Sequence, residues 1–206
     1  MTPIERPRVV GDREQEIFRA TLEALGEVGY DRLTMDAVAA KAKASKATLY
    51  RHWTNKVSLV IEALQHSKAP QGVPDTGSLR EDLRAAFCGV GGLSDAESVS
   101  TFSSVLTAIT RDEEFAAAFR RDVIGPKLAF SKEIWRRAQE RGELRDDVDL
   151  DLLEPALAGI VLHRVFIMGE APTEDVITRV IDQIILPAAT RAPASHRDSE
   201  QDKDRP

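Results

Sequence analysis

Apolar residues recur along most of this chain at steps of three and four, which is the spacing of a helix with one buried face. One such stripe extends over residues 12–28, and Gly29 directly after it suits a helix end. Strand-like alternation of apolar and polar residues is scarce. The pattern therefore predicts an all-α protein whose first helix covers residues 12–28.

Capping residues divide the next segment into three short helices. Thr34, Ser45 and Asn55 each precede a helical run, where a side-chain oxygen can accept a hydrogen bond from the first turn. We expect two turns of helix after Thr34 and a third helix over residues 46–53. Two short helices joined by a tight turn follow the helix-turn-helix plan.

The clearest break in the pattern lies at residues 69–77, which hold two prolines and two glycines. We place a domain boundary there. The prediction is an N-terminal domain over residues 1–66, with 1–11 as a flexible arm, and a second helical domain over 67–192. The N-terminal domain is a three-helix helix-turn-helix unit, and the fourth helix, after Asn55, is expected to bridge the two domains. Residues 193–206 are polar and are expected to form a disordered tail.

Capping residues and prolines also mark the helices of the second domain. Four residues are expected to open helices there, namely Ser78, Ser94, Asp149 and Thr173. The Gly125-Pro126 pair should kink or split a helical run over residues 115–141. The helix after Asp149 is expected to run to about residue 168, and Pro187 to end the last helix.

Charge is unevenly distributed along the 206 residues. The formal net charge is −6, yet the segment from Ala37 to Ile61 contains no acidic residue. Its basic residues are Lys41, Lys43, Lys46, Arg51 and Lys56. A solvated lysine-rich face would give the same count, but the helix-turn-helix pattern in the same segment favours a local site for nucleic acid.

A helix that reads DNA must bury one face for rigidity and present donors on the other. Leu49 and Trp53 lie four residues apart and are expected to point inward together. The opposite face would enter a major groove about 12 Å wide. Its candidate donors are Lys46, Thr48, Tyr50, Arg51 and His52.

The run SKATLYRHWTNKVSL, residues 45–59, resembles the recognition helix and following turn of the tetracycline-repressor (TetR) family. The residues that match directly are Ser45, Leu49, Tyr50, His52, Lys56 and Leu59, whereas Ala47 replaces the commoner Gly and Trp53 the commoner Phe. Residues 33–39 resemble the family's second helix. In all, the close resemblance covers about residues 12–66. It implies a helix-turn-helix DNA-binding domain followed by a helical ligand-binding and dimerisation domain.

The resemblance also implies roles for single residues. Those expected to hold phosphates are Thr34, Tyr50, His52 and Lys56, and those expected to face the groove or its edge are Lys46, Ala47, Thr48 and Arg51. Lys43 and Ser45 complete the expected DNA-binding set. Three alternatives stay open: Tyr50 packs on its neighbours, Lys41 and Lys43 are only solvated, or Arg51 pairs with an acid of the first helix.

The last two helices carry wide apolar faces, and a helix that is apolar around much of its surface needs burial on more than one side. They could fill a monomeric core, but a helix-turn-helix protein gains affinity by engaging two half-sites, which favours a homodimer. The expected interface residues are Leu157, Ile160, Val161, Ile177, Ile181 and Ile184.

By the same resemblance, the second domain would bind a small, largely apolar effector that releases a palindromic double-stranded operator. The candidate pocket residues are Phe102, Leu106, Phe115, Phe119, Phe130, Trp135 and His163, and plain core packing is the alternative for each. A regulator without a small-molecule ligand, controlled by a protein partner or by its own abundance, also stays open.

Other classes of protein find little support. The four histidines are far apart, the single cysteine allows no internal disulfide, and no nucleophile elbow or phosphate-binding glycine loop follows a strand. These observations argue against an enzyme, a metal site or a cofactor. No apolar run reaches the roughly 20 residues of a membrane helix and no export signal is visible, so we expect a cytoplasmic protein.

Overall fold

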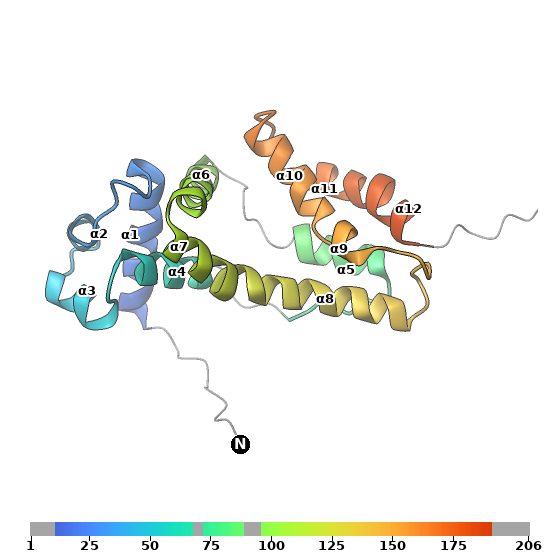
Figure 1. Ribbon diagram of the computed structural model, residues 1–206, viewed down its shortest axis with the longest axis horizontal. Coiled ribbons are helices and arrows are strands. Elements are labelled where there is room, and N and C mark those ends of the chain that lie inside the picture. The colour runs from blue at the N-terminus through green and yellow to red at the C-terminus, as the bar shows by residue number, and fades with distance from the viewer. Residues whose placement is uncertain (1–10, 68–71, 89–95, 191–206) are drawn as a thin grey trace, which may run out of the picture.

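The computed structural model describes residues 11–67, 72–88 and 96–190 (Figure 1). The described residues form helices and no β-strand beyond the isolated bridge between Leu144 and Thr190, which confirms the all-α class. The proposed arm and tail and the proposed cap Ser94 lie outside the described residues, apart from Gly11 at the end of the arm.

Four helices make up the N-terminal part: α1 (Asp12–Val28), α2 (Met35–Lys41), α3 (Lys46–His52) and α4 (Lys56–His66). The three predicted caps are confirmed. Thr34 Oγ1 accepts from the Ala37 N–H at 3.1 Å, Ser45 Oγ from Thr48 at 3.0 Å, and Asn55 Oδ1 from Ser58 at 2.9 Å. α1 ends before Gly29, whose φ of 76° suits a residue without a Cβ.

The remaining helical segments include two π-helical turns, η1 and η2. They are α5 (Leu79–Cys88), α6 (Ala96–Arg111), α7 (Glu113–Ala118), η1 (Phe119–Ile124), α8 (Gly125–Glu140), α9 (Leu150–Leu153), α10 (Ala156–Phe166), α11 (Glu174–Val180), η2 (Ile181–Ile185) and α12 (Leu186–Ala189). Ser78, Asp149 and Thr173 cap helices as predicted, through bonds to the N–H groups of Glu81, Leu152 and Val176.

Two expectations about helix ends are wrong, and both concern proline. The helix after Asp149 is split at Pro155 into α9 and α10, because proline lacks the N–H that would continue the helical hydrogen bonds. Pro187, in contrast, does not end the last helix, which continues to Ala189. Pro187 follows the π turn η2 and stands in the first turn of α12, where a helix needs no backbone donor.

The interruption predicted at Gly125-Pro126 takes the form of the π turn η1. Pro126 has no N–H to offer the carbonyl of Asp122, four residues earlier. That carbonyl instead accepts a hydrogen bond from Gln65 Nε2 of α4 at 2.9 Å. The defect in the helix thus becomes an attachment point for α4.

Buried apolar side chains form two clusters. The first combines residues of α1 to α4 with Val105, Ala108, Phe115, Phe119 and Val123 of α6, α7 and η1. The second joins α5, the C-terminal half of α8 and the helices from α10 onward. In Figure 1, α8 runs from the α6–α7 side of the molecule to the α5 side. The N-terminal helices therefore share a core with part of the second predicted domain, although the boundary at residue 67 stays a prediction.

Candidate nucleic-acid interface

Helix α3 is held rigidly by its buried face. Leu49 is 0% exposed and Trp53 3% exposed, as their spacing predicts. The Trp53 ring meets Phe18 of α1 edge-on with centroids 5.7 Å apart, and its indole N–H donates to Glu62 of α4. α3 is thus fixed against both longer helices of the N-terminal part.

The turn between α2 and α3 is held by a residue that the sequence analysis missed. Arg13 of α1 donates from Nη2 to the carbonyls of Ala42 at 2.9 Å and Lys43 at 2.8 Å. Lys43 itself adopts a left-handed backbone with φ of 49°. Arg13 lies about thirty residues before the turn, so no local pattern connects the two.

The opposite side of α3 is open to solvent. Lys46, Ala47, Tyr50 and Arg51 are exposed, and we call these four residues the recognition face. Tyr50 is 55% exposed, so it is not packed on its neighbours. Thr48 is half-buried, and its hydroxyl lies 2.8 Å from that of Ser45.

Acidic residues neutralise some of the local basic residues and not others. Lys41 pairs with Glu27 at 2.7 Å and with Glu23 at 3.5 Å, both on α1. Lys46 pairs with Asp36 of α2, and this hydrogen bond raises the pKa of the Lys46 ammonium. Lys43 and Arg51 have no acidic partner among the described residues, so their charges remain available.

An ion pair between Arg51 and an acidic residue of α1 was one of the open alternatives, but Glu14 of α1 lies near His52 instead. Glu14 Oε1 is 3.9 Å from His52 Nδ1, while the Arg51 guanidinium approaches His52 Nε2 at 3.4 Å. Lys56, expected at a phosphate, donates from Nζ to the Tyr30 carbonyl at 3.0 Å and lies 4.1 Å from the centre of the Tyr30 ring. Thr34 is exposed at the start of α2.

The N-terminal part is joined to the rest through α1, α4 and the turn after α1. The Tyr30 hydroxyl donates to Asp112 at 2.8 Å, and Asn55 Nδ2 to Glu114 at 3.1 Å. A Cβ at Gly26 of α1 would lie 3.0 Å from the Thr101 hydroxyl of α6, so these helices pack closely. The Phe115 N–H, with the Tyr30 hydroxyl, lowers the pKa of Asp112, which keeps this acceptor ionised.

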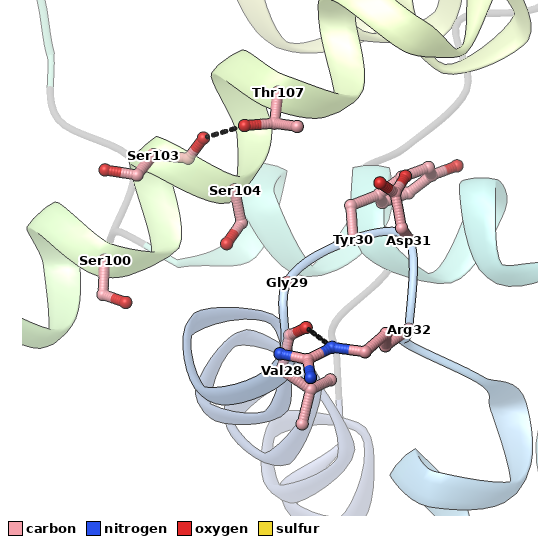
Figure 2. A pocket seen from close by; sticks show the side chains of 9 residues that line it. All are labelled: Val28, Gly29, Tyr30, Asp31, Arg32, Ser100, Ser103, Ser104 and Thr107. Atoms are coloured by element: carbon pink, nitrogen blue, oxygen red, sulfur yellow. Dashed lines mark hydrogen bonds between the residues drawn. The ribbon is translucent and has the colours of Figure 1, made fainter.

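A hollow of about 380 Å³ lies at the same joint (Figure 2). Residues 28–32 form one wall, and hydroxyl side chains of α6 form the other: Ser100, Ser103, Ser104 and Thr107. None of the seven predicted pocket residues lines this hollow.

The predicted pocket residues divide into two groups. Phe115, Phe119 and Trp135 are at most 6% exposed and lie within the two packed clusters, so core packing accounts for them. Phe102 stacks on Phe166 of α10 with centroids 5.7 Å apart. The others are Leu106, which is 37% exposed, Phe130, which is half-buried, and His163, which is exposed.

The residues predicted at the dimer interface differ in their exposure in the single chain. Leu157, Ile177 and Ile181 are 2%, 8% and 0% exposed in the single chain, where they belong to the second cluster. Their place in an interface between two copies stays a prediction. The helical repeat turns them toward the chain's own core. Ile160 and Val161 are half-buried, and Ile184 is 46% exposed. Three further apolar residues in this part of the chain are exposed, which are Leu152, Ile167 and Met168.

Two absences were found within the described part of the chain. None of its helices has the length and apolar character needed to cross a membrane. No group of three or more His, Cys, Asp or Glu side chains in residues 11–67, 72–88 and 96–190 is placed to hold a metal ion.

This rigid, basic helix-turn-helix joined to an all-helical body is the architecture of a bacterial transcription regulator. Residues 17–63 match the family described as bacterial regulatory proteins, tetR family, and residues 73–184 match the tetracyclin repressor-like C-terminal domain. The chain belongs to the TetR family of DNA-binding transcription regulators, a family defined by regulation of transcription rather than by catalysis.

Individual relatives agree with this assignment. The HTH-type transcriptional regulator Rv1556 of Mycobacterium tuberculosis is 36% identical over 184 residues, which cover 87% of this chain and 89% of that protein. The DNA-binding transcriptional repressor TetR of Mycobacteroides abscessus is 35% identical over 177 residues, covering 84% and 92%. The crystal structure of the TetR-family regulator SCO0332 is 28% identical, with a TM-score of 0.63, and covers 89% of this chain and 100% of that one.

Proposed function

We propose that this protein is a homodimeric repressor that binds a palindromic operator in the cytoplasm and is released by a small, largely apolar effector. The observation that carries the DNA-binding half is the recognition face, which is exposed on a short helix while Leu49 and Trp53 lock the other side. Support for repression comes from the Mycobacteroides abscessus relative, which is named a transcriptional repressor.

In this proposal the recognition face reads bases, and the residues around it position the helix on the backbone. Arg51 and Lys46 contact base edges, and Ala47 leaves room for close approach. Lys46 exchanges its ion pair with Asp36 for DNA. The residues assigned to phosphates or to the groove edge are Thr34, Lys43, Ser45, Thr48, Tyr50, His52 and Lys56.

Selection from random-sequence DNA is expected to yield an inverted repeat whose binding weakens steeply with salt. Each neutralised phosphate contributes about 0.9 to the log–log salt slope. Lys43→Ala, which removes an unpaired charge at the turn, should weaken binding to all sequences alike and reduce this slope. Arg51→Ala should instead relax the preference at particular bases, at about 1–3 kcal/mol each.

Lys132→Ala is the matched control for these two variants, because it removes an exposed lysine of α8, outside the helix-turn-helix. It should leave the selected sequence, the affinity and the salt slope unchanged. A wild-type protein that selects no preferred sequence would contradict the proposal.

The dimer in this proposal is formed by the exposed apolar residues near the C-terminal end. We call Leu152, Ile167, Met168 and Ile184 the apolar outer set; they are between 46% and 74% exposed in the single chain. Burying such residues against a second copy removes apolar surface from water. A two-fold dimer would hold two recognition helices for half-sites about 34–36 Å apart.

The effector half of the proposal rests on how α4 is attached. Gln65 binds the Asp122 carbonyl in η1, and Asn55 binds Glu114 in α7, so α4 is tied to the helices of the body at both ends. A ligand that shifts α7 or η1 would move α4, and with it the recognition helix, out of register with the second half-site.

Reciprocal coupling is the expected signature of such an effector. A compound that weakens operator binding must itself bind more weakly, by the same factor, to the operator complex, and typical coupling is about 1–3 kcal/mol. Compounds found by thermal stabilisation of the free protein would be titrated calorimetrically with and without operator. Equal affinities in both titrations would instead favour a regulator controlled by a protein partner or by abundance.

A further inference from the structure

Asp36 is an acidic residue on the surface that is proposed to bind DNA. It stands immediately before the basic segment from Ala37 to Ile61, which contains no acidic residue. Its side chain is 54% exposed in the first turn of α2, two residues after Thr34, which the proposed function assigns to a phosphate. A carboxylate accepts hydrogen bonds but cannot donate one, and its charge opposes the approach of phosphates. Asp36 therefore disfavours contact with a DNA backbone as such.

The carboxylate of Asp36 is attached to the recognition face. It accepts a hydrogen bond from the ammonium group of Lys46, the first residue of α3, and forms an ion pair with it. The turn between the two helices is held by Arg13 through the carbonyls of Ala42 and Lys43, so the backbone fixes where the pair stands. One charged donor and one charged acceptor are thus presented side by side from two helices.

A guanine–cytosine pair presents the complementary arrangement in the major groove. Guanine offers the acceptors N7 and O6, and the N4 amino group of cytosine lies next to them as a donor. Lysine donates to guanine O6 and N7, and aspartate accepts from cytosine N4. An adenine–thymine pair instead places the acceptor O4 of thymine beyond its single amino group, where a carboxylate would be repelled. The Lys46–Asp36 pair therefore matches a guanine–cytosine pair.

We propose that Asp36 is a specificity-determining residue that reads the cytosine of the same base pair whose guanine is read by Lys46. On the operator the ion pair is exchanged: Lys46 donates to guanine O6 and N7, while Asp36 accepts from cytosine N4. On other sequences the released carboxylate meets acceptors and phosphates, so its charge is not compensated. The inference rests on the proposed function, in which Lys46 contacts a base edge, and adds the second member of the pair.

The test is the sequence that each variant selects from random-sequence DNA. Asp36→Ala and Lys46→Ala should both relax the preference at the same guanine–cytosine position of each half-site, by about tenfold. Arg51→Ala should relax a different position, and Asp36→Glu, which keeps the charged acceptor, should retain the preference. A purely structural role of Asp36 in the first turn of α2 would instead weaken binding to all sequences alike.

Affinity for DNA that lacks the operator gives a second measurement. Asp36→Ala should bind such DNA more tightly than the wild type, because a carboxylate beside the phosphates has been removed. Asp31→Ala is the matched control, since Asp31 is also 54% exposed and pairs at 2.7 Å with Arg111, which is 65% exposed against 64% for Lys46. It lies in the turn after α1, outside the recognition face, and should leave the selected sequence unchanged.

An operator with N4-methylcytosine at the shared position tests the cytosine contact directly, because the methyl group replaces the amino hydrogen that faces the major groove. The wild type should bind this operator about tenfold more weakly than the unmodified one. Asp36→Ala should bind both operators equally. Equal wild-type affinities for the two operators would overturn the contact.

Results of the selection distinguish failure of this inference from failure of the proposed function. An unchanged selected sequence in Asp36→Ala would show that Asp36 merely repels the backbone, and relaxation at a position other than that of Lys46→Ala would refute the shared base pair. In both cases Arg51→Ala still decides whether the recognition face reads bases. A wild type that selects no sequence would refute the proposed function and this inference together.

Discussion

Ile184→Asp is expected to give a folded monomer that has lost most of its affinity for the operator. Ile184 is 46% exposed in the single chain, so a carboxylate there is tolerated by the monomer. In the proposed dimer the same carboxylate would be buried without a partner, at a cost of several kcal/mol. Because linked half-sites gain about 10²–10⁴-fold in affinity, separation of the two copies should cost a comparable factor. Light scattering and operator titration would measure both effects.

Ile181→Asp provides the contrast, because Ile181 lies only three residues before Ile184 but is 0% exposed. Its carboxylate would enter the chain's own second cluster, so this variant should unfold or aggregate rather than form a soluble monomer. Lys132→Asp, on the exposed face of α8, should remain a folded dimer. If Ile184→Asp stays dimeric, or if the wild type is a monomer with full operator affinity, the proposed interface is wrong.

Local chemistry made most of the helix starts predictable from the sequence. Thr34, Ser45 and Asn55 each accept a hydrogen bond from their own first turn, within three residues, so the signal is complete in a short segment. The failures came from proline. Pro155 splits a run that its apolar residues alone would continue, and Pro187 is accommodated because a π turn precedes it. That turn depends on packing and leaves no signature in the local sequence.

The recognition face was also predictable from a short segment, because the spacing of Leu49 and Trp53 fixes which residues of α3 point outward. Contacts between distant segments were not predictable. Arg13 holds the α2–α3 turn from about thirty residues away, and Gln65 reaches Asp122 across 57 positions. The burial of Ile181 in the chain's own core was not predictable, because an apolar face looks alike in the sequence whether it packs on its own chain or on a copy.

Asp82→Ala is expected to destabilise the body of the protein by about 3 kcal/mol, because it leaves Arg141 without its most buried partner. Asp82 is 0% exposed. Its carboxylate accepts from Arg141 Nη2 at 3.0 Å, from the Thr76 N–H at 2.6 Å and from the Thr76 hydroxyl at 2.7 Å. These bonds connect the start of α5 to the end of α8, which are both part of the second cluster.

The control for this variant is Asp75→Ala. Asp75 lies 3.6 Å from the same Arg141, but its side chain is 62% exposed, so the loss should stay below about 1 kcal/mol. Urea unfolding followed by circular dichroism would measure both variants.

The first cluster makes none of these contacts, so Asp82→Ala should leave it folded at urea concentrations that unfold the second cluster. The fluorescence of Trp53 reports on the first cluster once Trp135 has been replaced by Phe. In Asp82→Ala this fluorescence should change at a higher urea concentration than the overall loss of helix. Equal losses for Asp82→Ala and Asp75→Ala would show that burial does not strengthen this ion pair, and a single shared transition would show that the two clusters unfold as one unit.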